Sequence, residues 1–213
     1  MSGRIVILNG APRSGKSSIA SAMQESLPGR WINLGVDAQN RSLPPALLPG
    51  IGLRPGGERP DLEPMVVALY GALYDAIAAH ARAGFDVVAD LGHHDAYSQP
   101  LNILPACARR LGGHDVLLVG VHCPLEEIMA RRNADPQGGL YACGPGIPEP
   151  VRRWQDAVHV PGIYDLTVDT GHMTPADCVA AIAALLADPP QVRAFARLAT
   201  MSPPPSAPGG DRA

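Results

Sequence analysis

The segment from Gly10 to Ser17 constrains the fold most, because it matches the phosphate-binding loop pattern G-x-x-x-x-G-K-[ST] in full. An apolar, β-branched run at 4–8 precedes it and has the length of a buried parallel strand. After Lys16, apolar residues recur at helical spacing until a Pro-Gly pair. Strand, glycine loop and helix in this order predict N–H groups that converge on phosphate oxygens at the positive end of a helix. The alternative is a glycine-rich turn that binds nothing.

Lys16 is the only lysine of the 213 residues, and arginine supplies every other fixed positive charge. A compact ammonium group can follow the β- and γ-phosphates of a nucleotide, whereas a planar guanidinium group prefers a fixed geometry. The sequence therefore predicts a nucleoside triphosphate site. Its predicted residues are Gly10, Ala11, Pro12, Arg13, Ser14, Gly15, Lys16, Ser17 and Ser18. The Ser17 hydroxyl would serve Mg²⁺, and Arg13 would either help to bind phosphate or face water.

Composition narrows the possible partners of the chain. With 46% hydrophobic residues, the chain can bury one substantial core. A net charge of −3 leaves no basic footprint for nucleic acid, so we expect a small-molecule substrate and no nucleic acid. The cysteines form no C-x-x-C pair, which favours buried thiols over zinc or disulfides. No apolar run approaches the length expected of a membrane span, so we expect no membrane partner and a cytoplasmic location. A homo-oligomer is left open.

The rest of the chain alternates between strand and helix patterns. Further strands are predicted at 31–34, 85–89, 116–121 and 166–168, and helices at 63–83, 100–111, 125–132, 149–158 and 174–187. This alternation predicts a parallel α/β sheet wrapped on both faces in one domain, residues 1–188. Residues 189–213 are expected to be an extension, with a weakly docked helix at 191–200 and disorder from about 202. A Pro- and Gly-rich stretch at 42–60 is expected to lie over the mouth of the site.

Two acids follow predicted strands, where ligands bind in sheets of this kind. Asp37 could accept the proton of a hydroxyl group placed in line with a γ-phosphate, or it could cap a helix or form part of a turn. Asp90 ends an apolar strand and could orient Mg²⁺-bound water or the substrate; the alternative is a simple turn at the strand end.

Four further side chains are candidates for the site. His93 and His94 come directly after the strand that Asp90 ends, and we expect them to contact the substrate. A metal site there is the weaker interpretation, because no second pair of ligands has recognisable spacing. Arg131 and Arg132 end a predicted helix, where cations that fold over a transferring phosphoryl group are expected. They could also form an ordinary solvated helix end.

Several ordered stretches resemble the chloramphenicol phosphotransferase-like P-loop kinases. They are residues 5–10 with 15–17, Gly35-Val36-Asp37, 81–84 leading to 87–90, 119–123, 158–159, 164–165 and 168–170. The resemblance implies a P-loop kinase fold, with a parallel five-stranded sheet, helices on both faces and a lid segment. It also implies that ATP phosphorylates a hydroxyl of an antibiotic, with Asp37 as the base. Leu91 stands where the family tends to have a second acid, and the stretch 133–139 departs from the family's arginine-rich lid turn.

The leading hypothesis is a Mg²⁺- and ATP-dependent kinase that phosphorylates a small-molecule alcohol, with Lys16 and Asp37 in catalytic roles. One alternative is a metabolic kinase of the shikimate, gluconate or nucleoside type on the same scaffold. Another is a nucleotide-binding module with no phosphoryl acceptor. The guanine-specific N-K-x-D motif, which would favour a GTPase, cannot be present, because it would need a second lysine.

Overall fold

The computed structural model describes residues 2–47, 53–135 and 146–201. Its strands are β1 (Ile5–Asn9), β2 (Trp31–Asn33), β3 (Asp86–Leu91), β4 (Val116–His122) and β5 (Leu166–Asp169). Its helices are α1 (Lys16–Ser26), α2 (Val36–Asn40), α3 (Glu63–Arg82), α4 (Ile103–Arg110), α5 (Leu125–Ala134), α6 (Glu149–Val158), α7 (Pro175–Ala187) and α8 (Ala194–Ala199), with a 3₁₀ turn η1 (Pro45–Leu47). The five predicted strands are all present. α2 and η1 were not predicted, because each is too short to show a helical period.

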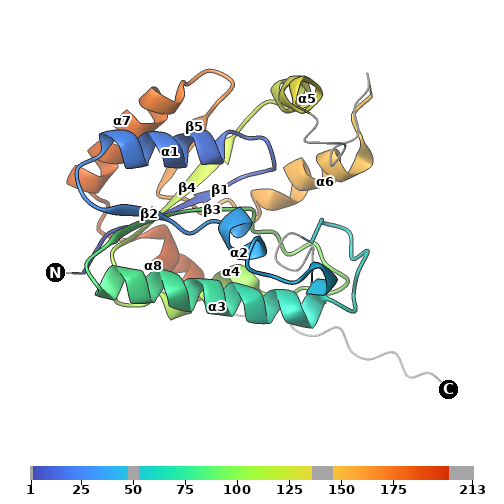
Figure 1. Cartoon of the computed structure of the whole chain (residues 1–213), viewed down its shortest axis with the longest axis horizontal. Helices are drawn as coiled ribbons and strands as arrows, with labels where there is room; N and C mark the ends of the chain where they lie inside the picture. The colour runs from blue at the N-terminus through green and yellow to red at the C-terminus, as the bar shows by residue number, and fades with distance from the viewer. Residues whose placement is uncertain (1, 48–52, 136–145, 202–213) are drawn as a thin grey trace.

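The five strands form one parallel sheet in the order β2-β3-β1-β4-β5. α1 and α7 cover one face, and α3, α4 and α8 cover the other (Figure 1). Successive residues of β1 point to opposite faces, so Ile5 and Ile7 join the core under α3 and α4, while Val6 and Leu8 join the core under α1. This is the predicted α/β fold with helices on both faces.

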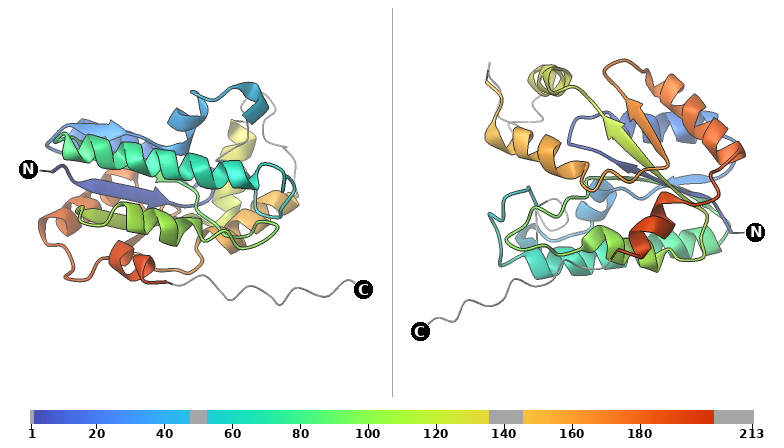
Figure 2. Two further views of the ribbon diagram at one scale, coloured as in Figure 1. Left: turned by 90° about the horizontal axis from the view of Figure 1, so that it is seen from below. Right: turned by 180° about the vertical axis from the view of Figure 1, so that it is seen from behind.

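The carboxyl ends of the strands lie at one edge of the sheet, beside α2, α5 and α6 (Figures 1 and 2). β1 lies in the middle of the sheet, with β3 on one side and β4 on the other. The chain after β1 therefore enters the crevice between the two halves of the sheet, which is where open α/β sheets bind ligands. A smaller apolar cluster joins α5 and α6 at this edge through Ile128, Met129, Val151 and Val158.

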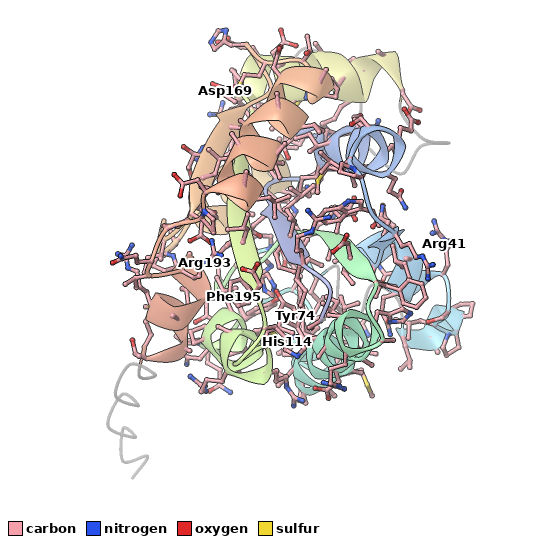
Figure 3. All side chains as sticks on the ribbon, turned by 90° about the vertical axis from the view of Figure 1, so that its left-hand side faces the viewer. Arg41, Tyr74, His114, Asp169, Arg193 and Phe195 are labelled. Atoms are coloured by element: carbon pink, nitrogen blue, oxygen red, sulfur yellow. The ribbon has the colours of Figure 1, made fainter. Side chains whose placement is uncertain are left out.

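The apolar core continues beyond residue 188, contrary to the expectation of a weakly docked helix. Ala194, Phe195 and Leu198 of α8 are at most 5% exposed and belong to the core cluster under α3 and α4. The ring centroids of Phe195 and Tyr74 are 6.3 Å apart, and both residues are labelled in Figure 3. The boundary at residue 188 stays a prediction, and residues 202–213 lie outside the described part of the chain.

α3 is, by length and composition alone, long and apolar enough to cross a membrane, with a mean hydropathy of 1.2. This corrects the expectation that no segment approaches that length. In the fold, its apolar residues pack against the sheet: Val66, Tyr70, Leu73, Tyr74, Ile77 and Ala81 are all buried. Burial of this side against the core accounts for the apolar composition.

Candidate functional site

The predicted phosphate loop connects β1 to α1 at the centre of the crevice. A Cβ atom on Gly10 would lie 2.4 Å from the carbonyl oxygen of Val121, so the close approach of β4 excludes any side chain there. Gly15 precedes α1 in a left-handed conformation (φ 91°), which residues with a Cβ rarely adopt. These two glycines let the loop curl at the N-terminus of α1, where unpaired N–H groups favour anions.

Lys16, the first residue of α1, points back over this loop. Its Nζ donates to the carbonyl oxygen of Ala11 at 2.8 Å. Burial lowers the pKa of Lys16 from its ordinary value of 10.5 to about 8, while the carboxylates of Asp90 and Asp37 favour the charged ammonium. The structure thus brings both predicted acids into the electrostatic surroundings of the loop lysine.

Ser17 and Asp90 meet beside the loop. The Ser17 Oγ donates to Asp90 Oδ2 at 2.6 Å, and Asp90 is 9% exposed. A Cβ atom on Gly35 would lie 1.5 Å from Asp90 Oδ1, so only glycine allows α2 to begin this close to the carboxylate. A hydroxyl and a carboxylate are oxygen ligands of the kind that Mg²⁺ takes, so this pair fits the predicted ion.

Asp37 lies in the first turn of α2 and is exposed. The N-cap residue of α2 is Gly35, and no side chain caps this helix. The interpretation of Asp37 as a helix cap is therefore wrong. Its carboxylate instead faces the cleft, which it lines together with Lys16 and Asp90.

Arg131, in the last turn of α5, links that helix to the phosphate loop. Its guanidinium group donates to the Arg13 carbonyl oxygen at 3.2 Å and to the Thr170 Oγ1 and carbonyl oxygen at 3.1 and 2.8 Å. Thr170 Oγ1 in turn donates to the carbonyl oxygen of Ser14 at 2.7 Å. These bonds clamp the middle of the loop between α5 and the end of β5, so the interpretation of Arg131 as a solvated helix end does not hold.

The two cations flanking this clamp also face the cleft. Arg132 is buried and lines it. Arg13 lines it too, and its Nη1 forms a 3.0 Å ion pair with Asp135 Oδ2. The Arg13 guanidinium also donates to the Asp135 carbonyl oxygen. Part of the predicted lid, residues 136–145, lies outside the described residues.

His93 and His94 lie behind the cleft and do not line it. His93 is 2% exposed, its Nε2 is hydrogen-bonded to Tyr74 Oη at 2.8 Å, and burial lowers its pKa to about 3. His94 is 5% exposed, and its Nε2 donates to the carbonyl oxygen of Leu53 at 2.9 Å. The expectation of direct substrate contact is therefore corrected: each ring supports residues that line the cleft. Within the described segments, no three His, Cys, Asp or Glu side chains gather as a metal site.

Sequence reasoning assigned no role to Asn9, which organises the floor of the site. Its Nδ2 donates to the Val158 carbonyl oxygen at 2.8 Å and to Tyr164 Oη at 3.0 Å, and its Oδ1 accepts from the His93 N–H at 2.6 Å. Tyr164 Oη is also hydrogen-bonded to His159 Nδ1 at 2.8 Å. Asn9, the residue directly before the phosphate loop, thus connects α6, the segment after β3 and the segment leading to β5. Its position directly before Gly10 was the available signal.

One cleft of about 1680 Å³ contains the loop and both acids. Most of its lining residues fall into two groups, which we call walls. The phosphate-loop wall consists of Gly10, Ala11, Pro12, Arg13, Gly15, Lys16, Ser17, Ser18, Arg131, Thr170, Met173 and Pro175. The α2–α6 wall consists of Val36, Asp37, Asn40, Leu53, Arg54, Glu58, Arg59, Tyr70, Pro148, Pro150, Val151 and Trp154. A cleft of this volume has room for two small ligands.

Comparisons with known proteins agree with this geometry. A family model described as "Chloramphenicol phosphotransferase-like protein" matches residues 3–187. A Mycobacterium tuberculosis protein that carries the provisional name O-phosphotransferase is 29% identical over 184 residues, spanning 79% of this chain and 75% of its own length.

Solved structures show that the chain has the P-loop kinase fold. The APS kinase CysC of Mycobacterium tuberculosis, in complex with AMPPNP and APS, is 18% identical with a TM-score of 0.59 and covers 88% of this chain and 99% of its own. Shikimate kinase from Acinetobacter baumannii, with shikimate, is 14% identical with a TM-score of 0.55, over 87% and 93%. A Deinococcus radiodurans tunicamycin resistance protein is 19% identical with a TM-score of 0.53, over 86% and 95%.

Proposed function

The chain belongs to the chloramphenicol phosphotransferase-like family, and from this premise we propose that it uses ATP to phosphorylate a hydroxyl group of a small molecule. The family and the fold support a phosphotransferase of the kinase type. The observation that carries the finer proposal is the placement of Lys16, the Ser17–Asp90 pair and Asp37 in one cleft with two walls. A binding module would need the loop but not a carboxylate on the α2–α6 wall.

The phosphate-loop wall would bind the nucleotide. Loop N–H groups and the Lys16 ammonium would hold the β- and γ-phosphates, with Lys16 exchanging its bond to Ala11 for phosphate oxygens. Ser17 and Asp90 are the residues that would hold Mg²⁺, which neutralises phosphate charge when bound. The AMPPNP complex of the APS kinase supports the choice of an adenine nucleotide.

Asp37 would act as the general base from the α2–α6 wall. In the reaction, the acceptor oxygen bonds to the γ-phosphorus, the bond between that phosphorus and the β,γ-bridging oxygen breaks, and ADP leaves. The hydroxyl proton passes to the Asp37 carboxylate. Arg131 and Arg132 would stabilise the charge that develops on the transferring group, and the clamp through Thr170 positions Arg131 for this.

An acceptor screen tests the proposal. ATP consumption is measured against hydroxylated antibiotics and metabolites, and mass spectrometry detects a phosphate adduct of 80 Da, roughly the mass that one phosphoryl group adds. The Lys16→Ala variant is the control for contaminating kinases. An adduct that depends on Lys16 supports the proposal. ATP binding without any adduct would instead favour a nucleotide-binding module.

Two further points, the biological role and the location with assembly, rest on the sequence and on named relatives. Antibiotic inactivation is one candidate role, supported by the family's description and by the fold shared with a tunicamycin resistance protein. A cytoplasmic location stays a prediction, and the oligomeric state stays open.

A further inference from the structure

The α2–α6 wall contains a flat apolar surface held by buried contacts. A Cβ atom on Gly92 would lie 3.1 Å from the Trp154 ring, so the indole packs against the backbone just after β3. The Trp154 ring meets His94 edge-on, with centroids 5.0 Å apart. His94 also holds the Leu53 carbonyl oxygen. One buried imidazole thus fixes the segment at 53–54 relative to the indole, and a planar ligand could lie on this surface.

Tyr70 adds an unused polar group to this wall. Its side chain is 1% exposed, stacks on His93 with centroids 4.5 Å apart, and lines the cleft. Tyr74, one turn along α3, bonds His93 through its hydroxyl, and Tyr164 bonds Asn9. By contrast, nothing in the described parts of the chain forms a hydrogen bond with the Tyr70 hydroxyl. Because Tyr70 lines the cleft, this hydroxyl is open to a hydrogen bond with a ligand there.

Some charged residues of the α2–α6 wall form ion pairs, and one does not. Arg59 forms an ion pair with Asp61 at 2.8 Å, and Glu58 pairs with Arg153 of α6 at 3.1 Å. Arg54 lines the cleft and is exposed, and it forms no ion pair with any described residue. Arg54 therefore places an uncompensated positive charge on the wall that carries Asp37.

We propose that the acceptor is an alcohol with a flat apolar body and an anionic group, typically a carboxylate, which Arg54 and the Tyr70 hydroxyl bind while Trp154 supports the body. This rests on the proposed function and names its substrate class. Burial raises the pKa of Tyr70 well above 10, so its hydroxyl stays protonated and donates. A neutral alcohol would make neither the ion pair with Arg54 nor the hydrogen bond with Tyr70, so it should bind less tightly.

The choice of an anion also balances the charge of the wall. Asp37 must stay ionised to accept a proton, so it repels a second negative charge nearby. Arg54 offsets that repulsion and can bind a carboxylate through two parallel hydrogen bonds. The anion would therefore bind at the Arg54 end of the ligand, with the hydroxyl group at the Asp37 end.

Two matched probes test the proposal: 4-(hydroxymethyl)benzoate and 4-methylbenzyl alcohol, which share the ring and the alcohol and differ in the carboxylate. Binding is measured by titration calorimetry on the full chain with AMPPNP and Mg²⁺, and phosphorylation is measured separately with ATP by mass spectrometry. The carboxylate probe should bind at least roughly tenfold more tightly than the neutral probe. Arg54→Gln should remove that difference. Tyr70→Phe should reduce the difference, because the affinity for the carboxylate probe should fall roughly threefold to tenfold.

Arg41→Gln is the matched control, because Arg41 is also an exposed arginine but does not line the cleft. Arg41 directly follows α2 and is labelled in Figure 3. The Arg41→Gln variant should leave both affinities unchanged.

Equal affinity for the two probes, no binding of either, or a carboxylate preference that survives Arg54→Gln would overturn the inference. If the carboxylate binds through Arg54 but no phosphate adduct forms with ATP, the anion site stands and the assignment of this compound class as kinase acceptors fails. If a neutral alcohol is phosphorylated as well as the carboxylate, the kinase stands and the anion site fails.

Discussion

The two walls of the cleft are built in different ways. The phosphate-loop wall takes most of its residues from one contiguous stretch, 10–18, and its geometry is set by glycines and by backbone carbonyls that Arg131 and Thr170 hold. The α2–α6 wall draws side chains from separate segments around Asp37, Arg54, Tyr70 and Trp154. Backbone groups bind phosphate whatever the rest of the ligand is, whereas side chains distinguish one acceptor from another.

This difference assigns separate tasks to the walls. Changes on the phosphate-loop wall should affect transfer to every acceptor equally, and changes on the α2–α6 wall should affect acceptors unequally. Gly35 and Asp90 lie where the walls meet, because Asp90 bonds Ser17 on one side and contacts the start of α2 on the other. The predictions below test this division.

The largest effect is expected from Lys16→Ala. Removing the ammonium takes a positive charge from the transferring phosphoryl group, so kcat/KM should fall by roughly 10³ for every acceptor tested. Steady-state kinetics with at least two acceptors measures this, and circular dichroism confirms that the fold is kept. A loss confined to one acceptor would contradict the division between the walls.

Gly35→Ala should damage both walls at once. The new Cβ atom would collide with Asp90 Oδ1, which would displace either that carboxylate or α2 with Asp37. A misplacement of this size should lower kcat by roughly 10². Gly146→Ala is the control, since a Cβ atom there would come within 4 Å of no residue that the structure describes. Steady-state kinetics at varied Mg²⁺ and at varied acceptor concentration would show whether the Mg²⁺ dependence and the acceptor KM both change. A change in the acceptor KM alone would contradict a role for Asp90 on the nucleotide side.

ATP affinity should fall as the pH rises through about 8. The pKa of Lys16 is lowered to about 8, and phosphate binds the charged form, so the free protein loses the binding form above that pH. Between pH 7 and pH 9 the dissociation constant for ATP should rise roughly tenfold. Lys16→Arg should show a flat profile over this range, because a guanidinium group does not titrate there. A wild-type profile as flat as that of the variant would refute the lowered pKa.

The smallest effect is expected from Trp154→Leu. Loss of the aromatic contact should cost about 1 kcal/mol of acceptor binding and raise the acceptor KM roughly fivefold, with little change in the KM for ATP. Met173→Ala, on the phosphate-loop wall, should give the reverse pattern. Equal changes in both Michaelis constants for either variant would mean that the walls do not act separately.

Much of the fold follows from local pattern. The five strands lie within one or two residues of their predicted positions, because buried parallel strands are short, continuous apolar runs. α8 was expected to dock weakly, because six residues give no clear period; its burial depends on the partners that Tyr74 and the rest of the sheet face supply.

In the candidate site, too, the sequence predicts the parts that local pattern determines and not the parts that depend on packing. The loop from Gly10 to Ser17 was predictable, because one motif fixes its backbone geometry. His93 and His94 were misplaced, because strand-end position does not tell whether a side chain turns into the core or into the cleft. The positions of Tyr70 and Trp154 could not be predicted, because they depend on how α3 and α6 pack at the sheet edge.

Asp37→Asn tests the central claim, that the two walls meet in a phosphoryl transfer, most directly. The substitution is nearly isosteric and leaves the phosphate-loop wall intact, so ATP affinity by titration calorimetry should be unchanged. The single-turnover rate of transfer to the acceptor found by the screen should fall by roughly 10² or more, the contribution expected of a positioned general base. Unchanged ATP binding together with an unchanged transfer rate would contradict the account and leave Asp37 as a surface residue of α2.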